Sequence, residues 1–307
     1  MLFNINKNFL IGSLAIFTAA VMWSLDGTLI RPNFYEFPAM NIVLLEHFFW
    51  ALLLSPFLFW GWKRIWEMSQ KTMLSLVWVS FFWGLLGTLL ITEAYFAAFR
   101  GETTFATVVI LQKLQPVFAL FFASMILKEK LSGWFYSWAA VALFSAYMIA
   151  FGSLGTSIFS IEIFGTPAFY AMLAAFAFGS STVFGKNLVT DLGFRVSAAL
   201  RFTLTAVLSF FVVLILWDFS SISQLSSFHW QLLAIVVCTS GAGALFLYYF
   251  GLRKVTASSA TIFELAWPLS AIFFDWYFHE NILSSTQIIF SVVLLVSFFM
   301  IIEENKK

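Results

Sequence analysis

The sequence predicts an all-α integral membrane protein with ten transmembrane helices, arranged as two inverted five-helix repeats with both termini in the cytoplasm. Three observations lead to this prediction: an apolar composition, ten long apolar segments, and two half-chain stretches that follow one pattern. Of 307 residues, 62% are hydrophobic and 10% are charged, whereas a soluble domain carries roughly 25% charged residues. So few charges cannot cover a water-facing surface, and lipid must therefore be the main solvent.

Ten segments are long and apolar enough for a helix to cross the hydrocarbon core, which takes about 20 residues. They run near residues 9–30, 39–60, 74–99, 104–127, 134–151, 163–185, 196–217, 230–252, 257–278 and 285–302. The first segment is not followed by a small-residue cleavage site, so we expect it to be retained as a spanning helix. Residues 153–162 are rich in Ser and Gly and form the expected linker between two five-helix halves, 1–152 and 163–307.

The distribution of Lys and Arg between the loops predicts the orientation. If the N-terminus is cytoplasmic, the outer loops hold only Arg31 and Arg100. The inner loops and tails then hold twelve basic residues: Lys7, Lys63, Arg64, Lys71, Lys128, Lys130, Lys186, Arg195, Arg253, Lys254, Lys306 and Lys307. Cytoplasmic loops of membrane proteins are enriched in Lys and Arg, so both termini are expected in the cytoplasm.

Two proline-containing stretches, 108–131 and 260–280, follow the same plan half a chain apart. Pro116 and Pro268 are 268 − 116 = 152 residues apart, and each lies in the middle of an apolar segment. Further segments match at offsets of 153 to 155 residues: 23–31 with 178–186, and 95–100 with 248–253. Because five spans is an odd number, the two halves enter the membrane from opposite sides. Inverted repeats of this kind are typical of secondary transporters, which bind substrate near the bilayer midplane.

These motifs resemble the EamA-like family of the drug/metabolite transporter superfamily over nearly the whole chain. The resemblance rests on Trp23-Ser24 in the first helix of the first repeat and the matching Phe178-Gly179 in the second. It also rests on a proline inside the fourth helix of each repeat and a Glu a dozen residues later, as in Pro116–Glu129 and Pro268–Glu280. It implies a carrier with five plus five helices and alternating access. Known members carry amino acids, nucleotide-like cofactors, sugars or amphiphilic drugs, so the resemblance does not name a substrate.

Ionisable side chains inside the apolar segments are the strongest functional signal. The sequence places seven of them there: Asp26, Glu46, Glu93, Lys113, Arg201, Glu264 and Asp275. Each costs roughly 2.5–3.5 kcal/mol at a helix centre on insertion scales. Seven facing lipid would cost on the order of 20 kcal/mol, more than the net stability of a domain. We therefore expect them to face the protein interior, paired or hydrated.

The substrate site is expected at the two proline breaks. A proline frees the carbonyl four residues earlier, which is that of Gln112 for Pro116 and that of Glu264 for Pro268. Gln115 shares a helix face with Gln112, and Lys113 lies beside them. Lys113 and Glu264 then bind the two charges of an amino-acid-like zwitterion, which is the favoured substrate class. The alternative is that they form a structural ion pair across the two halves.

Four further polar residues are candidates for coupling or gating. Glu46 and His47 are a candidate protonation site, because histidine titrates near neutral pH, and H+ is a candidate coupling ion. Alternatively, Glu46 pairs with a basic residue and His47 is an interior donor. Asp26 is either a gate residue or the partner of Arg31. Arg201 either binds an anion or pairs with Glu46, its counterpart in the repeat.

Four aromatic residues, Trp23, Tyr95, Tyr248 and Trp267, lie close to these polar positions in the sequence. They either wall the pathway, where they would stack on a flat or cationic substrate, or serve in ordinary packing. Most of the other aromatic residues are expected to face lipid or to mark the membrane interfaces.

The function predicted from these features is secondary transport of a small polar or amphiphilic metabolite across the cell (inner) membrane. A channel-like permease is the main alternative, followed by a membrane enzyme or an interaction protein. The sequence has no phosphate-binding loop, and its single cysteine, Cys238, excludes an internal disulfide. We expect no catalytic residue, metal or other cofactor, and a net charge of +1 predicts no nucleic-acid partner. The protein is expected to be a monomer or a homodimer.

Overall fold

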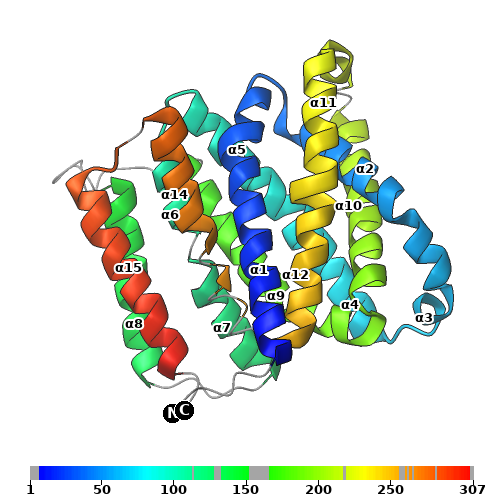
Figure 1. The fold of residues 1–307 in the computed structure, drawn as a ribbon, viewed down its shortest axis with the longest axis horizontal. Coiled ribbons are helices and arrows are strands. Elements are labelled where there is room, and N and C mark those ends of the chain that lie inside the picture. The colour runs from blue at the N-terminus through cyan, green and yellow to red at the C-terminus, as the bar shows by residue number, and fades with distance from the viewer. Residues whose placement is uncertain are drawn as a thin grey trace.

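The computed structural model describes residues 7–112, 114–127, 133–151, 166–216, 219–255, 260, 263–264, 266–280 and 282–304, and these residues form helices and connecting turns (Figure 1). The first half contains α1 (Lys7–Leu25), η1 (Asp26–Ile30), η2 (Arg31–Phe34), α2 (Ala39–Trp60), α3 (Trp62–Trp66), α4 (Gln70–Trp78), η3 (Val79–Gly87), α5 (Thr88–Phe99), α6 (Phe105–Gln112), α7 (Gln115–Leu127) and α8 (Gly133–Phe151). The second half contains α9 (Pro167–Leu192), α10 (Phe194–Leu216), η5 (Ser220–Gln224), α11 (Ser227–Val236), η6 (Val237–Gly241), α12 (Ala242–Lys254), α14 (Ala266–His279) and α15 (Ser285–Glu304).

Within the described residues, seven helices are long and apolar enough to cross a membrane. They are Asn8–Phe34, Ala39–Trp60, Gln70–Phe99, Thr107–Ile126, Pro167–Leu192, Phe194–Leu216 and Ser227–Lys254. Each lies where the sequence predicts a span. Helices α8, α14 and α15 lie at the positions of the other three predicted spans, so the count of ten stays a prediction. The linker at 153–162 lies outside the described residues.

The distribution of side chains is the reverse of that in a soluble protein. Large apolar side chains such as Leu52, Phe59, Phe211 and Ile215 are exposed on the outside of the bundle. The interior, in contrast, contains buried charged residues from several helices. In lipid there is no penalty for an apolar exterior, whereas a charge is tolerated only where it faces the protein interior. The fold is that of a multi-pass membrane protein.

The helices pack in pairs that join the two halves of the chain. Helix α2 packs along α10, α8 along α15, and α1 along α12. Figure 1 shows α8 and α15 side by side at one edge of the bundle, with α1 and α12 nearer its middle. Helix α1 also contacts α14, while α9 contacts α7 and the η3–α5 segment. Almost every major interface is therefore made between the halves rather than within one of them.

Helices α1 and α12 cross closely because both carry a glycine at the crossing. A Cβ atom on Gly251 would lie 2.5 Å from the carbonyl oxygen of Gly12. Glycine is enriched at such interfaces in membranes because it allows two backbones to approach. This crossing holds the N-terminal part of α1 against the second half of the chain.

The two prolines stand at helix starts rather than at kinks in continuous helices, which corrects the expected geometry. Pro116 is the second residue of α7, and α6 ends at Gln112. Pro268 is the third residue of α14. Proline is tolerated in the first helical turn, where its missing N–H would have no partner. The carbonyl of Glu264, which the sequence predicts to be free, accepts the backbone N–H of Trp267 at 3.0 Å.

Candidate functional site

One cavity in the interior of the bundle brings together most of the residues predicted from the sequence. Its empty volume, including the space at its opening, is about 850 Å³. Predicted residues that line it are Trp23, Asp26, His47, Tyr95, Gln112, Gln115, Arg201, Glu264 and Trp267. Glu46, Tyr248 and the two prolines do not line it, and Lys113 lies outside the described residues.

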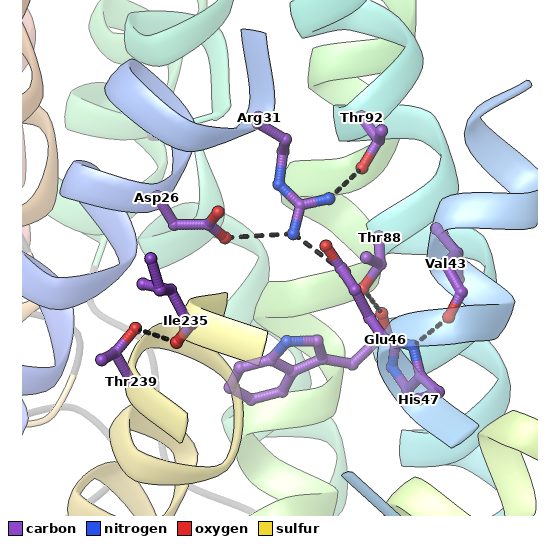
Figure 2. A network of polar contacts seen from close by, with 10 residues as sticks. Asp26, Arg31, Val43, Glu46, His47, Thr88, Thr92, Ile235 and Thr239 are labelled. Carbon is purple, nitrogen blue, oxygen red and sulfur yellow. Dashed lines mark hydrogen bonds and ion pairs between the residues drawn. The ribbon is translucent and has the colours of Figure 1, made fainter. Parts of the chain in front are cut away.

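Arg31 joins three helices through its guanidinium group. Its Nη2 atom is 3.1 Å from Asp26 Oδ2 and 3.0 Å from Glu46 Oε2, and Nη1 donates to the Thr92 hydroxyl at 2.9 Å (Figure 2). The side chains of Arg31, Asp26 and Glu46 are all buried. Two carboxylates share one cation, and each keeps one buried oxygen, Asp26 Oδ1 and Glu46 Oε1, without a partner. The pair of Arg201 with Glu46, one of the two alternatives, is not found, because Arg31 occupies that position.

Arg201 is a buried cation that has no ion pair within the described residues. It comes from α10, is 3% exposed, and places its guanidinium 4.4 Å from the centre of the Trp83 ring. A cation over an aromatic face is stabilised by the ring quadrupole, but its donors still need acceptors. Two of them, Nε and Nη1, are buried without a hydrogen-bond partner. Arg201 therefore offers free donors to whatever occupies the cavity.

Glu264 is held by hydrogen bonds from both halves of the chain. Tyr248 OH donates to its Oε1 at 2.8 Å, and the side-chain amide of Gln115 donates to its Oε2. Gln115 begins α7, directly after the break that follows Gln112. The break therefore lets both glutamines reach the cavity from separate helical segments. Gln112 Oε1 is buried and has no hydrogen-bond partner in the part of the chain that the structure describes.

Aromatic rings form most of the apolar wall. Trp23 lies against Trp83 and Tyr248, with ring centroids 6.2 and 5.4 Å apart. On another side, Tyr95 stacks on Trp267 with an interplanar angle of 25°. Among the described residues, the buried Tyr95 hydroxyl has no hydrogen-bond partner. A wall of flat rings with one free hydroxyl suits a flat ligand that also carries polar groups.

Three π-helical segments contribute to the cavity: η1, η3 and η6. They supply Asp26 and Gly27, Trp83, and Ser240 and Gly241, respectively. π-Helical turns are rare and often mark functional sites, because the extra residue shifts the side chains that follow. Their concentration around one cavity supports the assignment of this cavity as the functional site.

Two of the tryptophans that line the cavity, Trp50 and Trp83, were not predicted from the sequence. Trp50 follows Glu46 by four residues and His47 by three, so helical periodicity places all three on one side of α2, and this signal could have found it. Trp83 lies in the run Val79–Gly87, where the π-helical geometry shifts the register. No periodicity rule for an α-helix would have predicted its direction.

Comparison with known proteins gives the family. The model of the EamA-like transporter family matches residues 10–151 and again residues 165–303. The chain belongs to the EamA-like transporter family. It is therefore a multi-pass membrane transporter of a small metabolite and not an enzyme, and its partners are the lipid bilayer and a small-molecule substrate.

A relative and a solved structure support this family and fold. The chain is 34% identical to the riboflavin transporter ImpX of Fusobacterium nucleatum subsp. nucleatum over 300 residues, which cover 97% of this chain and 99% of that protein. It also resembles a protein of known crystal structure with a TM-score of 0.59. That match covers 94% of this chain and 95% of the other at 15% identity, so it shows a shared fold alone.

Proposed function

We propose that this EamA-like transporter carries riboflavin, or a closely related flavin, across the cell (inner) membrane by alternating access. The single observation that carries the proposal is the composition of the cavity: aromatic rings on several sides and polar atoms without partners between them. Similarity to a riboflavin transporter over almost the full length of both chains supports the same substrate class.

The chemistry of a flavin matches this cavity. Its ring system is flat and aromatic, and so can stack between side chains such as Trp23, Trp83 and Trp267. Its hydroxylated side chain and the polar edge of the ring need hydrogen bonds in a site from which water is excluded. Asp26 Oδ1, Tyr95 OH and Gln112 Oε1 are buried, have no hydrogen-bond partner among the described residues, and are available for this purpose.

The proposed mechanism uses two inverted halves, 1–152 and 163–307, with both termini cytoplasmic. The family model matches each half separately. The packing is also mirrored: α1 contacts α12 and α14, and α9 makes the corresponding contacts with η3–α5 and α7. Two halves that pack through equivalent interfaces can exchange conformations, which would open the cavity to each side in turn. Asp26 and Glu46 share the single positive charge of Arg31, so the cluster carries one net negative charge. Binding of a proton would neutralise this charge, which favours H+ as the coupling ion.

An amino-acid-like zwitterion is the alternative substrate class. It requires Glu264 to bind an ammonium group and Lys113 a carboxylate. Within the described residues, Glu264 already accepts hydrogen bonds from Gln115 and Tyr248. This arrangement favours a substrate that is recognised mainly elsewhere in the cavity.

Counterflow in liposomes tests the proposal. Vesicles containing purified protein are loaded with unlabelled riboflavin, diluted into labelled riboflavin, and compared with vesicles loaded with a mixture of amino acids. We expect saturable uptake of the label that requires riboflavin inside, with faster net uptake when the outside is more acidic. Exchange of amino acids but not of riboflavin would contradict the proposed substrate, and uptake that does not saturate would indicate a channel.

A further inference from the structure

Three polar side chains on α2 and α10 form one wall of the cavity around Phe202. The Trp50 and His47 rings lie 4.7 and 5.7 Å from the Phe202 ring, and the Arg201 guanidinium lies 5.5 Å from it. The His47 and Trp50 rings are 4.7 Å apart. Because α2 and α10 pack along each other, these groups are held in a fixed arrangement by rigid elements.

The hydrogen-bonding character of each group follows from its chemistry. Arg201 Nε and Nη1 and Trp50 Nε1 can only donate. His47 Nδ1 lies 2.8 Å from the carbonyl oxygen of Val43 (Figure 2), and a hydrogen bond to a carbonyl requires the proton on Nδ1. In the neutral ring, Nε2 is therefore an acceptor. The wall presents donors from Arg201 and Trp50, and an acceptor from His47.

Four atoms of the wall, Arg201 Nε and Nη1, Trp50 Nε1 and His47 Nε2, are buried and have no hydrogen-bond partner in the part of the chain that the structure describes. Arg201, Trp50 and His47 are 3%, 6% and 1% exposed. Buried polar groups almost always have partners, and those that lack one call for an explanation. A ligand that supplies one acceptor to Arg201, one acceptor to Trp50 and one donor to His47 would give each of the three side chains a partner.

We propose that this wall recognises a cyclic imide edge, in which an N–H group stands between two carbonyl groups. This inference rests on the flavin transport proposed above. Arg201 and Trp50 donate to the two carbonyl oxygens, and His47 Nε2 accepts from the N–H. In a flavin this edge is the pyrimidine part of the ring system, with N3–H between the carbonyl oxygens at C2 and C4. The wall thus selects the flavin ring itself, while the rest of the cavity holds its side chain.

Riboflavin and 3-methylriboflavin test this inference. The second compound carries a methyl group in place of the N3 hydrogen and is otherwise the same molecule. Binding to purified protein in detergent micelles is measured by flavin fluorescence. We expect the methyl compound to bind at least about tenfold more weakly, because His47 Nε2 loses its donor and remains buried. Equal affinity for the two compounds would overturn the imide contact while leaving riboflavin transport intact. Failure of riboflavin itself to bind would overturn the proposed function and this inference with it.

Variants then assign the contacts. In His47→Ala the preference for riboflavin over 3-methylriboflavin is expected to fall below about threefold, because both the acceptor and the steric barrier to the methyl group are removed. Trp50→Phe removes the indole N–H donor and part of the ring but leaves His47 in place, so it should weaken the binding of both compounds alike and keep the preference. Trp134→Phe, on the exposed face of α8, is the matched control and should bind as wild type. If His47→Ala lost affinity equally for both compounds, His47 would act only in packing. That result would overturn its role in recognising the imide N–H. The comparison of the two compounds on wild-type protein requires no variant to fold.

Discussion

Replacing Arg31 with methionine is expected to lower the free energy of unfolding by about 3–5 kcal/mol, the usual cost of removing one partner of a buried ion pair. The side chain is of similar length, so little packing volume is lost. The loss comes instead from Asp26 and Glu46, whose carboxylates lie 3.1 and 3.0 Å from the Arg31 guanidinium and would be left in the bundle without a cation. Unfolding in detergent micelles, followed by tryptophan fluorescence, measures the change.

Arg100→Met is the matched control for this prediction. Arg100 also forms an ion pair, with Glu102 at 2.6 Å, but the two side chains are 40% and 49% exposed. Exposed pairs contribute less than about 1 kcal/mol. Similar small effects of both substitutions would show that the Arg31 cluster does not hold the three helices together.

Gly241→Ala is expected to destabilise the protein by about 1–3 kcal/mol, the usual cost of overpacking an interior. A Cβ atom at Gly241 would lie 1.9 Å from Cε2 of Trp50. Trp50 is 6% exposed and packs against His47 and Phe202, so moving the ring away from the added methyl group would disturb these contacts. The substitution should lower the melting temperature and also disturb the cavity wall.

Gly185→Ala on α9 separates this clash from the general effect of adding a methyl group to a helix. The nearest atom to a Cβ at Gly185 is 3.8 Å away, on the Tyr249 ring, which is ordinary contact. Alanine is also the better helix former, so this variant should be at least as stable as wild type. If both variants were equally stable, the close approach of Gly241 to Trp50 would be wrong.

The helical fold and most of the cavity could be predicted from the sequence because they depend on burial of charge in an apolar chain. Asp26, His47, Arg201 and Glu264 are expensive in lipid, and the structure places all of them in the interior around one cavity. The seven spans confirmed by length and composition follow from apolar runs alone. These predictions needed no knowledge of tertiary contacts.

The pair of Asp26 with Arg31 was one of the alternatives, but the partner of Glu46 could not be predicted, because pairing between helices depends on how they rotate against each other. Glu46 was assigned Arg201 as one alternative on the basis of the repeat, yet the partner is Arg31, from the turn at the end of the first helix. The π-helical segments have no signature in the sequence, and they bring Trp83 and Gly241 to the cavity. The function of the individual site residues stays a prediction.

Counterflow of riboflavin by Gly27→Phe tests most directly whether the cavity is the substrate site. A Cβ atom at Gly27 would lie 3.6 Å from the Tyr95 ring and 3.7 Å from the Trp267 ring, so the backbone tolerates a side chain whose ring must then occupy the cavity. Gly133→Phe is the control, because no atom of the described residues lies within 4 Å of a Cβ at that position. We predict that Gly27→Phe remains folded but exchanges no riboflavin, while Gly133→Phe exchanges it as wild type does. Exchange at the wild-type rate by folded Gly27→Phe would contradict this assignment and place the pathway elsewhere in the bundle.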